Sequence, residues 1–335
     1  MRDADHPMAH GTVVIERLVS RILKGNPLHD PATRDVAVYL PPGYDSKKRY
    51  PIVYGIVGYT GTGRSLFNID PLSEDLATRM DRLIASGKCG PMIIAAPDCF
   101  SRVGGSQYVN SSAVGRYEDY LLEEVLPFVE SRYKVGRRGI WGKSSGGYGS
   151  IIQGLRHPEV FSAFADHSGD ALFELCYIQD FGTALTAYRK AGGPKRWLDR
   201  FWRQPNRHHG EDHPVLNTLG MAAFYSPNPR SPHMGIDFPF DLATGEWRPE
   251  VWDRWRGWDP VNLMEDRRAA LRRMRLVYID CGTKDEFNLI WGARTLHRKL
   301  KAWGIRHVYR EFEDGHMSIP YRYDVSLPRL SRALR

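Results

Sequence analysis

Residues 139–150, GIWGKSSGGYGS, place two adjacent serines among glycines, directly after a short β-rich run and directly before a helical pattern. Centred on Ser144, the stretch has the form G-x-S-x-G. A sharp turn from strand to helix has no room for side chains two residues to either side of the serine. Centred on Ser145, the position two before is Lys143, whose side chain does not fit. The stretch therefore predicts a nucleophile elbow on Ser144, and the plainer interpretation is a glycine-rich turn before a helix.

Around this stretch, strand and helix patterns alternate along the chain. β-rich or apolar runs predict strands at 11–20, 34–44, 50–58, 92–98, 138–142, 161–169, 275–282 and 307–314. Apolar residues at helical spacing predict helices at 73–87 with a serine N-cap, at 115–133 with a bend at Pro127, at 145–158 and at 289–304. Repeated strand–helix units with short apolar strands indicate an α/β fold, with a mostly parallel sheet flanked by helices on both faces.

Residues 171–265 interrupt this alternation. They hold six of the nine tryptophans: Trp197, Trp202, Trp247, Trp252, Trp255 and Trp258. The stretch is too long for a plain loop and lies between two strands. We expect one domain over 1–335 with this stretch as an inserted cap, called the insertion below. Its tryptophans indicate an aromatic or bulky substrate group, or simply the insertion's own core.

Composition narrows the class of protein. The chain has 335 residues, 42% hydrophobic and 26% charged, as in folded globular proteins. It has no apolar run near the roughly 20 residues that span a bilayer, and MRDADHPMAHG at the N-terminus lacks the apolar segment of a secretory signal. We therefore expect a cytoplasmic protein without a membrane partner. The four cysteines show no metal-ligand spacing, so we expect free thiols and neither metal nor cofactor.

The net charge of +8 raises the possibility of a nucleic-acid partner. Basic residues gather at 136–139, 265–276, 294–301 and the C-terminus, and in the last three stretches they recur among leucines. That pattern is typical of the solvent-exposed faces of amphipathic helices. We expect no nucleic-acid binding, and the sequence leaves the oligomeric state open.

A serine hydroxyl is a weak nucleophile at neutral pH, and it needs a base to take its proton and a carboxylate to orient that base. In parallel α/β sheets such groups follow the carboxyl ends of strands. The loop GTKDEF places Asp285 after strand 275–282, and the loop EDGHM places His316 after the last strand. The chain order Ser, Asp, His is the order expected with such an elbow. We therefore predict a triad of Ser144, Asp285 and His316.

Three other residues compete for these roles. His167, in DHSGD, also follows a strand and is the second candidate base. Asp280 lies within a strand and is expected to face a helix. Glu286 is adjacent to the predicted acid but, one residue further on, points elsewhere.

The oxyanion that forms during acyl transfer needs backbone N–H donors. Ser145 follows the nucleophile and begins a helix, whose N-terminus carries a positive dipole end. The loop GYTGTG follows strand 50–58 at the neighbouring strand end. We assign the N–H of Tyr59 as the second donor, with Thr60 as the alternative and a flexible turn as the plainer interpretation.

With these residues in place, the chain resembles the esterase family of α/β hydrolases that includes enterochelin esterases, esterase D-type enzymes, feruloyl esterase modules and mycolyltransferases. The resemblance covers most of the chain outside the insertion and rests on YLPPGY, YEDYLLEEVLPFVESRY, GKSSGGYGS, DCGTKDEF and EDGHM. It implies the α/β-hydrolase fold, with Ser144, Asp285 and His316 corresponding to the family's triad. The family's oxyanion loop commonly reads His-Gly, whereas here Val57 precedes Gly58.

The sequence thus predicts a serine hydrolase that cleaves carboxylic esters of small molecules through an acyl-enzyme. The alternative is an acyltransferase or another biosynthetic enzyme on the same triad, which passes the acyl group to an alcohol or amine. The choice depends on whether the insertion excludes water. A basic nucleic-acid-binding protein is the third and weakest hypothesis.

Overall fold

The computed structural model describes residues 9–207 and 210–335. Its main sheet has the strand order β1-β2-β4-β3-β7-β8-β9-β10. These strands are β1 (Thr12–Val19), β2 (Thr33–Leu40), β3 (Tyr50–Ile56), β4 (Ile93–Pro97), β7 (Val135–Lys143), β8 (Ala163–His167), β9 (Leu276–Gly282) and β10 (Val308–Phe312). The pairs that include β2 are antiparallel, and the pairs from β4 to β10 are parallel. The predicted mostly parallel sheet is confirmed.

Helices cover both faces of this sheet. The helices outside the insertion are α1 (Leu76–Ala85), α2 (Tyr117–Asp119), α3 (Leu126–Glu130), α4 (Ser145–Arg156), α11 (Arg268–Arg273), α12 (Leu289–Ala302) and α13 (Tyr323–Ala333). Side chains of α1 and α13 form one apolar core with the sheet, and those of α3, α4 and α12 belong to the core on the other face. The short strands β5 (Asn110–Ser111) and β6 (Gly115–Arg116) pair with each other beside the main sheet.

Three local predictions differ from the structure. The N-cap of α1 is Asp75, whose carboxylate accepts the N–H groups of Ala77 and Thr78, and not Ser73. The helix expected at 115–133 is divided into α2, a wide π-helical turn (Tyr120–Val125) and α3, with Pro127 in the first turn of α3. Proline has no N–H to donate, so the helical hydrogen bonding is interrupted at Pro127, directly after the wide turn that the N–H of Leu126 closes by donating to the carbonyl of Leu121. After His316 the chain forms α13, of which the sequence analysis predicted only the amphipathic pattern of the C-terminal basic residues and no helix bounds.

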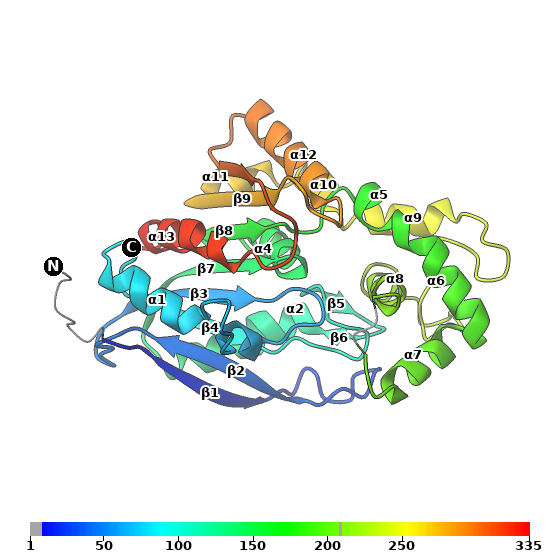
Figure 1. Ribbon diagram of the computed structural model, residues 1–335, viewed down its shortest axis with the longest axis horizontal. Coiled ribbons are helices and arrows are strands. Elements are labelled where there is room, and N and C mark those ends of the chain that lie inside the picture. Colours follow the sequence, from blue (N-terminus) through cyan, green and yellow to red (C-terminus); the bar gives the residue numbers. More distant parts are fainter. Residues whose placement is uncertain (1–8, 208–209) are drawn as a thin grey trace.

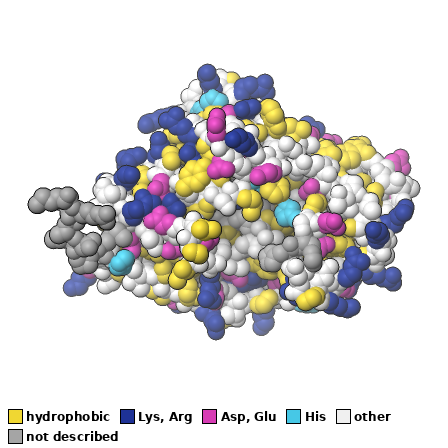
Figure 2. Space-filling view, viewed as in Figure 1, with side chains coloured by type: hydrophobic (Ala, Val, Ile, Leu, Met, Phe, Trp, Pro, Cys, Tyr) yellow, Lys and Arg dark blue, Asp and Glu magenta, His cyan; other side chains and the backbone are white. Residues whose placement is uncertain are grey.

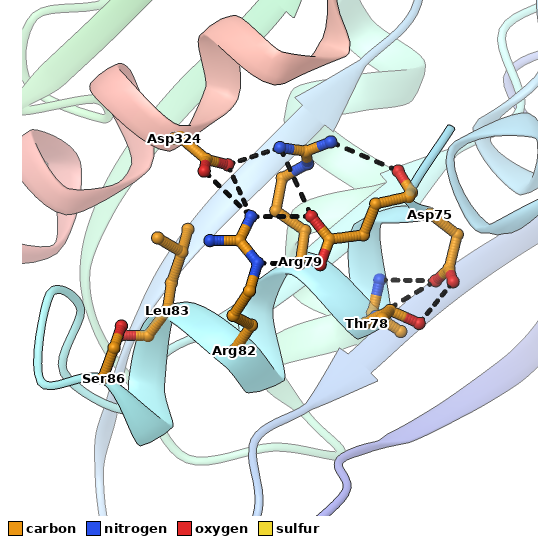
Figure 3. Close-up of polar contacts among 9 residues, drawn as sticks. Asp75, Thr78, Arg79, Arg82, Leu83, Ser86 and Asp324 are labelled. Atoms are coloured by element: carbon orange, nitrogen blue, oxygen red, sulfur yellow. Dashed lines mark hydrogen bonds and ion pairs between the residues drawn. The ribbon is translucent and has the colours of Figure 1, made fainter. Parts of the chain in front are cut away.

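Ion pairs fix α13 to α1 (Figure 3). Asp324, at the start of α13, accepts from Arg79 and, at 2.8 Å, from Arg82. Arg82 also pairs with Glu74 at 2.7 Å. The Arg79 side chain is 5% exposed, so its charge depends on these carboxylates for compensation.

Replacing Asp324 with alanine should lower the free energy of unfolding by about 1–3 kcal/mol, because the buried Arg79 loses its nearest carboxylate. Thermal unfolding followed by circular dichroism should show a midpoint lower by a few degrees. Asp266→Ala, which changes an exposed carboxylate, is the matched control and should leave the midpoint unchanged. Equal midpoints for the two variants would mean that the ion pairs contribute no net stability.

The insertion is helical, with α5 (Phe173–Cys176), α6 (Ile178–Ala191), α7 (Pro194–Arg203), α8 (Asp212–Tyr225), α9 (Pro249–Arg256) and α10 (Pro260–Leu263). Helices α6, α7 and α8 stand to one side of the sheet, beyond the arrowhead of β3 (Figure 1). That arrowhead marks the carboxyl end, where the predicted site residues follow their strands.

Charged side chains of both signs share the surface. Figure 2 shows Lys and Arg at separate places on one face, with Asp and Glu between them. This distribution agrees with solvated helix faces, and the expectation of no nucleic-acid partner stays a prediction. Within the described ranges, no helix is long and apolar enough to cross a membrane.

Candidate active site

Ser144 occupies a strained turn between β7 and α4. Its backbone has φ 59° and ψ −128°, a conformation that costs a non-glycine residue free energy. The turn is held by a 2.9 Å hydrogen bond from the Ser144 N–H to the carbonyl of His167 on β8. A Cβ on Gly142 or on Gly146 would lie 2.4 or 2.2 Å from the carbonyl oxygen of Ile56. The two glycines are therefore required by the close approach of β3, as the elbow interpretation expected.

His316 and Asp285 are held together next to this turn. Nδ1 of His316 lies 2.8 Å from Oδ2 of Asp285, and both side chains are buried. The other carboxylate oxygen, Oδ1, accepts the N–H groups of Phe287 at 3.0 Å and Leu289 at 3.3 Å. The Phe287 ring packs edge-on against the imidazole, with centroids 4.8 Å apart. The carboxylate thus has a fixed orientation, which in turn orients the imidazole.

A triad acid would contact a ring nitrogen of His316, whereas Glu286 contacts the backbone of that residue. Its carboxylate accepts the backbone N–H of His316 at 2.6 Å. It therefore holds the loop that carries the imidazole and does not contact the ring nitrogen, which agrees with the expectation that it points elsewhere.

Ser144 and His316 line one pocket, with a volume of about 230 Å³. Residues of the insertion form one wall of it: Cys176, Tyr177, His213 and Asn217. Ser145, Tyr59 and Thr60 also line the pocket. The structure thus brings together side chains from the elbow, from the loop after β10 and from the insertion.

The loop after β3 distinguishes the two candidate oxyanion donors. The N–H of Thr60 already donates to the carbonyl of Gly104 at 2.7 Å. The N–H groups of Tyr59 and Ser145 have no acceptor within the part of the chain that the structure describes. This arrangement favours Tyr59 over Thr60.

Two tyrosine hydroxyls fix this loop. The hydroxyl of Tyr108 lies 2.8 Å from the N–H and 2.6 Å from the carbonyl of Val57. The hydroxyl of Tyr59 itself lies 2.5 Å from the carbonyl of Val103 and 2.8 Å from that of Leu216 in α8. The predicted donor is thereby connected to the insertion. Neither contact could be predicted from the sequence, because the partners are distant along the chain.

The second candidate base lies away from the pocket. His167 is fully buried between Asp280, 2.6 Å from Nδ1, and Ser326 of α13, 2.7 Å from Nε2. Asp280 also accepts from the hydroxyl of Tyr278 at 2.7 Å and from Arg322 at 3.1 Å. Asp280 therefore faces a helix, as expected. Ser326, His167 and Asp280 together connect α13 to the sheet, and none of them lines the pocket that contains Ser144.

Three residues that the sequence reasoning did not single out also line the pocket: Lys143, Asp170 and His213. Burial lowers the pKa of the Lys143 amine. Burial and then the nearby His316 lower the pKa of His213, so its imidazole stays neutral to lower pH than usual. Asp170 could have been found from the sequence, since it follows a predicted strand in the same way as Asp285 does.

Half of the six tryptophans of the insertion belong to its buried core. Trp197, Trp252 and Trp255 are buried, and Trp252 and Trp255 pack against each other and against Phe181. Trp202 is different. It lines a second pocket of about 310 Å³, which shares Thr60 and His213 with the first. The two pockets therefore adjoin at these shared residues.

This sheet, its strained serine turn and the histidine–aspartate pair after the last strands define the chain as an α/β hydrolase. The model of the family described as "Putative esterase" matches residues 31–331. The chain therefore belongs to this family of carboxylic ester hydrolases.

The chain is also similar to one curated protein over part of its length and to solved structures over nearly all of it. The chain is 34% identical over 101 residues to endo-1,4-beta-xylanase Y of Acetivibrio thermocellus, a match that covers 30% of this chain and 8% of that protein. Among solved structures, a ferulic acid esterase superposes with a TM-score of 0.63 at 21% identity, covering 97% of this chain and 99% of the other. An S-formylglutathione hydrolase from Agrobacterium tumefaciens has a TM-score of 0.58 at 17% identity, with 98% and 97% covered. At these identities the solved structures show the shared fold.

Proposed function

We propose that the chain is a serine esterase in which Ser144 attacks the ester carbonyl. His316 takes the serine proton and gives it to the leaving alcohol, while Asp285 holds the imidazole and stabilises its positive charge. Water then attacks the acyl-enzyme, with His316 as the base, and releases the acid. The observation that carries the proposal is the 2.8 Å contact from Asp285 to Nδ1 of His316, in a pocket that this histidine shares with the strained serine.

The N–H groups of Tyr59 and Ser145 would bind the oxyanion. Both residues line the pocket beside the serine, and neither N–H has another acceptor within the described ranges. Backbone donors of this kind need no rearrangement as charge develops, which is the source of their catalytic effect.

A product assay tests hydrolysis against acyl transfer. The protein is given an aryl ester in water, with and without an added alcohol or amine, and the acyl products are separated. Free acid as the main product in both reactions supports the esterase. An acyltransferase would instead give the new ester or amide in preference to acid.

The pocket volume suggests the size of the group that enters it. An apolar cavity of about 150 Å³ holds a benzene molecule, so about 230 Å³ accommodates one ring with a short arm. One similar structure is a feruloyl esterase module from Clostridium thermocellum complexed with sinapinate, with a TM-score of 0.57 at 15% identity. We propose small-molecule esters with a ring-sized group as substrates.

Trp202→Ala should reduce kcat/KM for a bulky aromatic ester by about ten- to a hundredfold, while a small acetyl ester should change by less than about tenfold. The second pocket that Trp202 lines adjoins the serine pocket, and its binding energy serves only substrates large enough to reach it. Trp252→Ala is the matched control, since this ring lies in the insertion and lines neither pocket. Equal losses on both esters for Trp202→Ala would show that this ring only supports the fold.

A further inference from the structure

Asp170 is a buried carboxylate beside the proposed catalytic residues. It comes shortly after β8, is 6% exposed, and lines the pocket together with Ser144 and His316. The triad mechanism gives it no role. Its position therefore needs a separate explanation, because burying a carboxylate is costly unless partners compensate it.

One oxygen of this carboxylate is anchored. Oδ2 accepts from Nε2 of Gln107 at 2.8 Å and from the hydroxyl of Tyr177 at 2.8 Å. Gln107 is itself buried, and its amide also donates to the hydroxyl of Tyr225 at 3.0 Å. These contacts fix the direction of the carboxylate, so that the other oxygen has a defined position.

The other oxygen, Oδ1, is available. It has no hydrogen-bond partner within the described ranges, and it is not among the fully enclosed polar atoms that lack one. It therefore remains in contact with the open space of the pocket. The hydrogen-bond donors that the described chain offers to this carboxylate, Gln107 and Tyr177, are both uncharged. Burial accordingly raises the pKa of this carboxyl.

We propose that Oδ1 of Asp170 accepts a hydrogen bond from a hydroxyl or ammonium group on the part of the ester that enters the pocket. This inference rests on the proposed function and names its substrate class: esters whose ring-sized group carries a hydrogen-bond donor. The apolar walls, which include Tyr177, Phe287 and Leu289, would hold the carbon frame. A substrate without the donor leaves Oδ1 unpaired in a site that has lost its water, and it is disfavoured for that reason.

The test compares matched esters. One series consists of 4-nitrophenyl esters of 3-phenylpropanoic acid with hydrogen, hydroxyl, methoxy or aminomethyl at the para position of the acid. The second series places the same substituents on the benzyl alcohol of benzyl acetates. We expect the wild-type kcat/KM to be about ten- to a hundredfold higher for a donor-bearing ester than for its methoxy analogue in one of the series. The hydroxyl and aminomethyl arms show which donor is preferred, and the two series show which side of the ester enters the pocket.

The variant Asp170→Asn tests whether the preference depends on this carboxylate. Because Gln107 and Tyr177 both donate, the asparagine oxygen should face them, and its NH₂ group should face the pocket. The site then donates where it used to accept, so the preference should shift from the hydroxyl ester to the methoxy ester. Any effect of the lost charge on His316 changes kcat/KM for all esters by the same factor. It therefore cancels in the ratio of kcat/KM for the hydroxyl ester to that for the methoxy ester. Asp237→Asn is the control, since this buried carboxylate of the insertion pairs with Asn228 and Arg254 outside the pocket, and its ratio should stay at the wild-type value.

Equal wild-type rates for donor and methoxy esters in both series would overturn the inference. So would a lower activity of Asp170→Asn on every ester by one common factor, which is the result of a purely structural role. Neither result affects the proposed function, because hydrolysis of the unsubstituted ester reports on that separately.

Discussion

Replacing Ser144 with alanine should reduce ester hydrolysis by a factor on the order of 10⁴ to 10⁶, down to the rate left by oxyanion binding and substrate orientation. The fold should persist, because the backbone contact of Ser144 with His167 does not involve the hydroxyl. Alanine at this position retains the same strained φ of 59°, so the thermal midpoint should change little. Initial rates on a chromogenic aryl ester, together with labelling by a fluorophosphonate probe, measure the effect.

Ser145→Ala is the matched control for that experiment. Ser145 contributes its backbone N–H to the proposed oxyanion site, and the N–H survives the change to alanine. This variant should keep most of the activity and should still react with the probe. An inactive Ser145→Ala with an active Ser144→Ala would place the nucleophile one residue further along.

Asp285→Asn should lower turnover by a factor on the order of 10⁴ at unchanged fold. The asparagine oxygen would remain on the N–H groups of Phe287 and Leu289, which occupy Oδ1 in the native structure. The NH₂ group would then face Nδ1 of His316 and force the imidazole proton onto Nε2. An imidazole in that tautomer cannot accept the serine proton, so kcat should fall at every pH at which the native protein is active.

The variant Asp280→Asn distinguishes the role of Asp280 from that of Asp285. Asp280 pairs with His167 and Arg322 in the buried network beneath α13, so its amide should lower the thermal midpoint and leave turnover per folded molecule close to wild type. A loss in turnover as large as that of Asp285→Asn, at unchanged stability, would mean that the acid is misassigned.

Local pattern was sufficient for much of the fold. The strand at 50–58 corresponds to β3 (Tyr50–Ile56), and the helix at 145–158 corresponds to α4 (Ser145–Arg156). Such elements can be recognised from the spacing of apolar residues and from glycine or proline at their ends. Both signals lie within a few residues of the element itself. The helix at 115–133 was predicted less well, because a wide turn depends on what packs around it and not on propensity alone.

The terminal helix α13 was predicted only in part, from the basic residues among leucines at the C-terminus, for a related reason. Its sequence, YDVSLPRLSRA, contains a proline, and the helix is held by contacts outside itself. Asp324 pairs with α1, and Ser326 reaches His167 on β8. Neither partner could be inferred from the residues next to it in sequence.

The sequence by itself was enough to predict Ser144, Asp285 and His316 as one candidate site. The G-x-S-x-G pattern around Ser144 could be recognised locally, although the atom that lies nearest to a Cβ at either glycine belongs to β3. The order of strands placed Asp285 and His316 after strand ends that had to meet at one edge of the sheet. The tertiary structure alone decided which other groups share that space. Asp170 and His213 reach the pocket, while His167 and Asp280 are directed to the opposite face of the sheet. The physical reason is that strand position follows from local pattern, whereas the direction of a side chain and the partner of a buried polar atom depend on segments many residues away, which only the folded chain brings together.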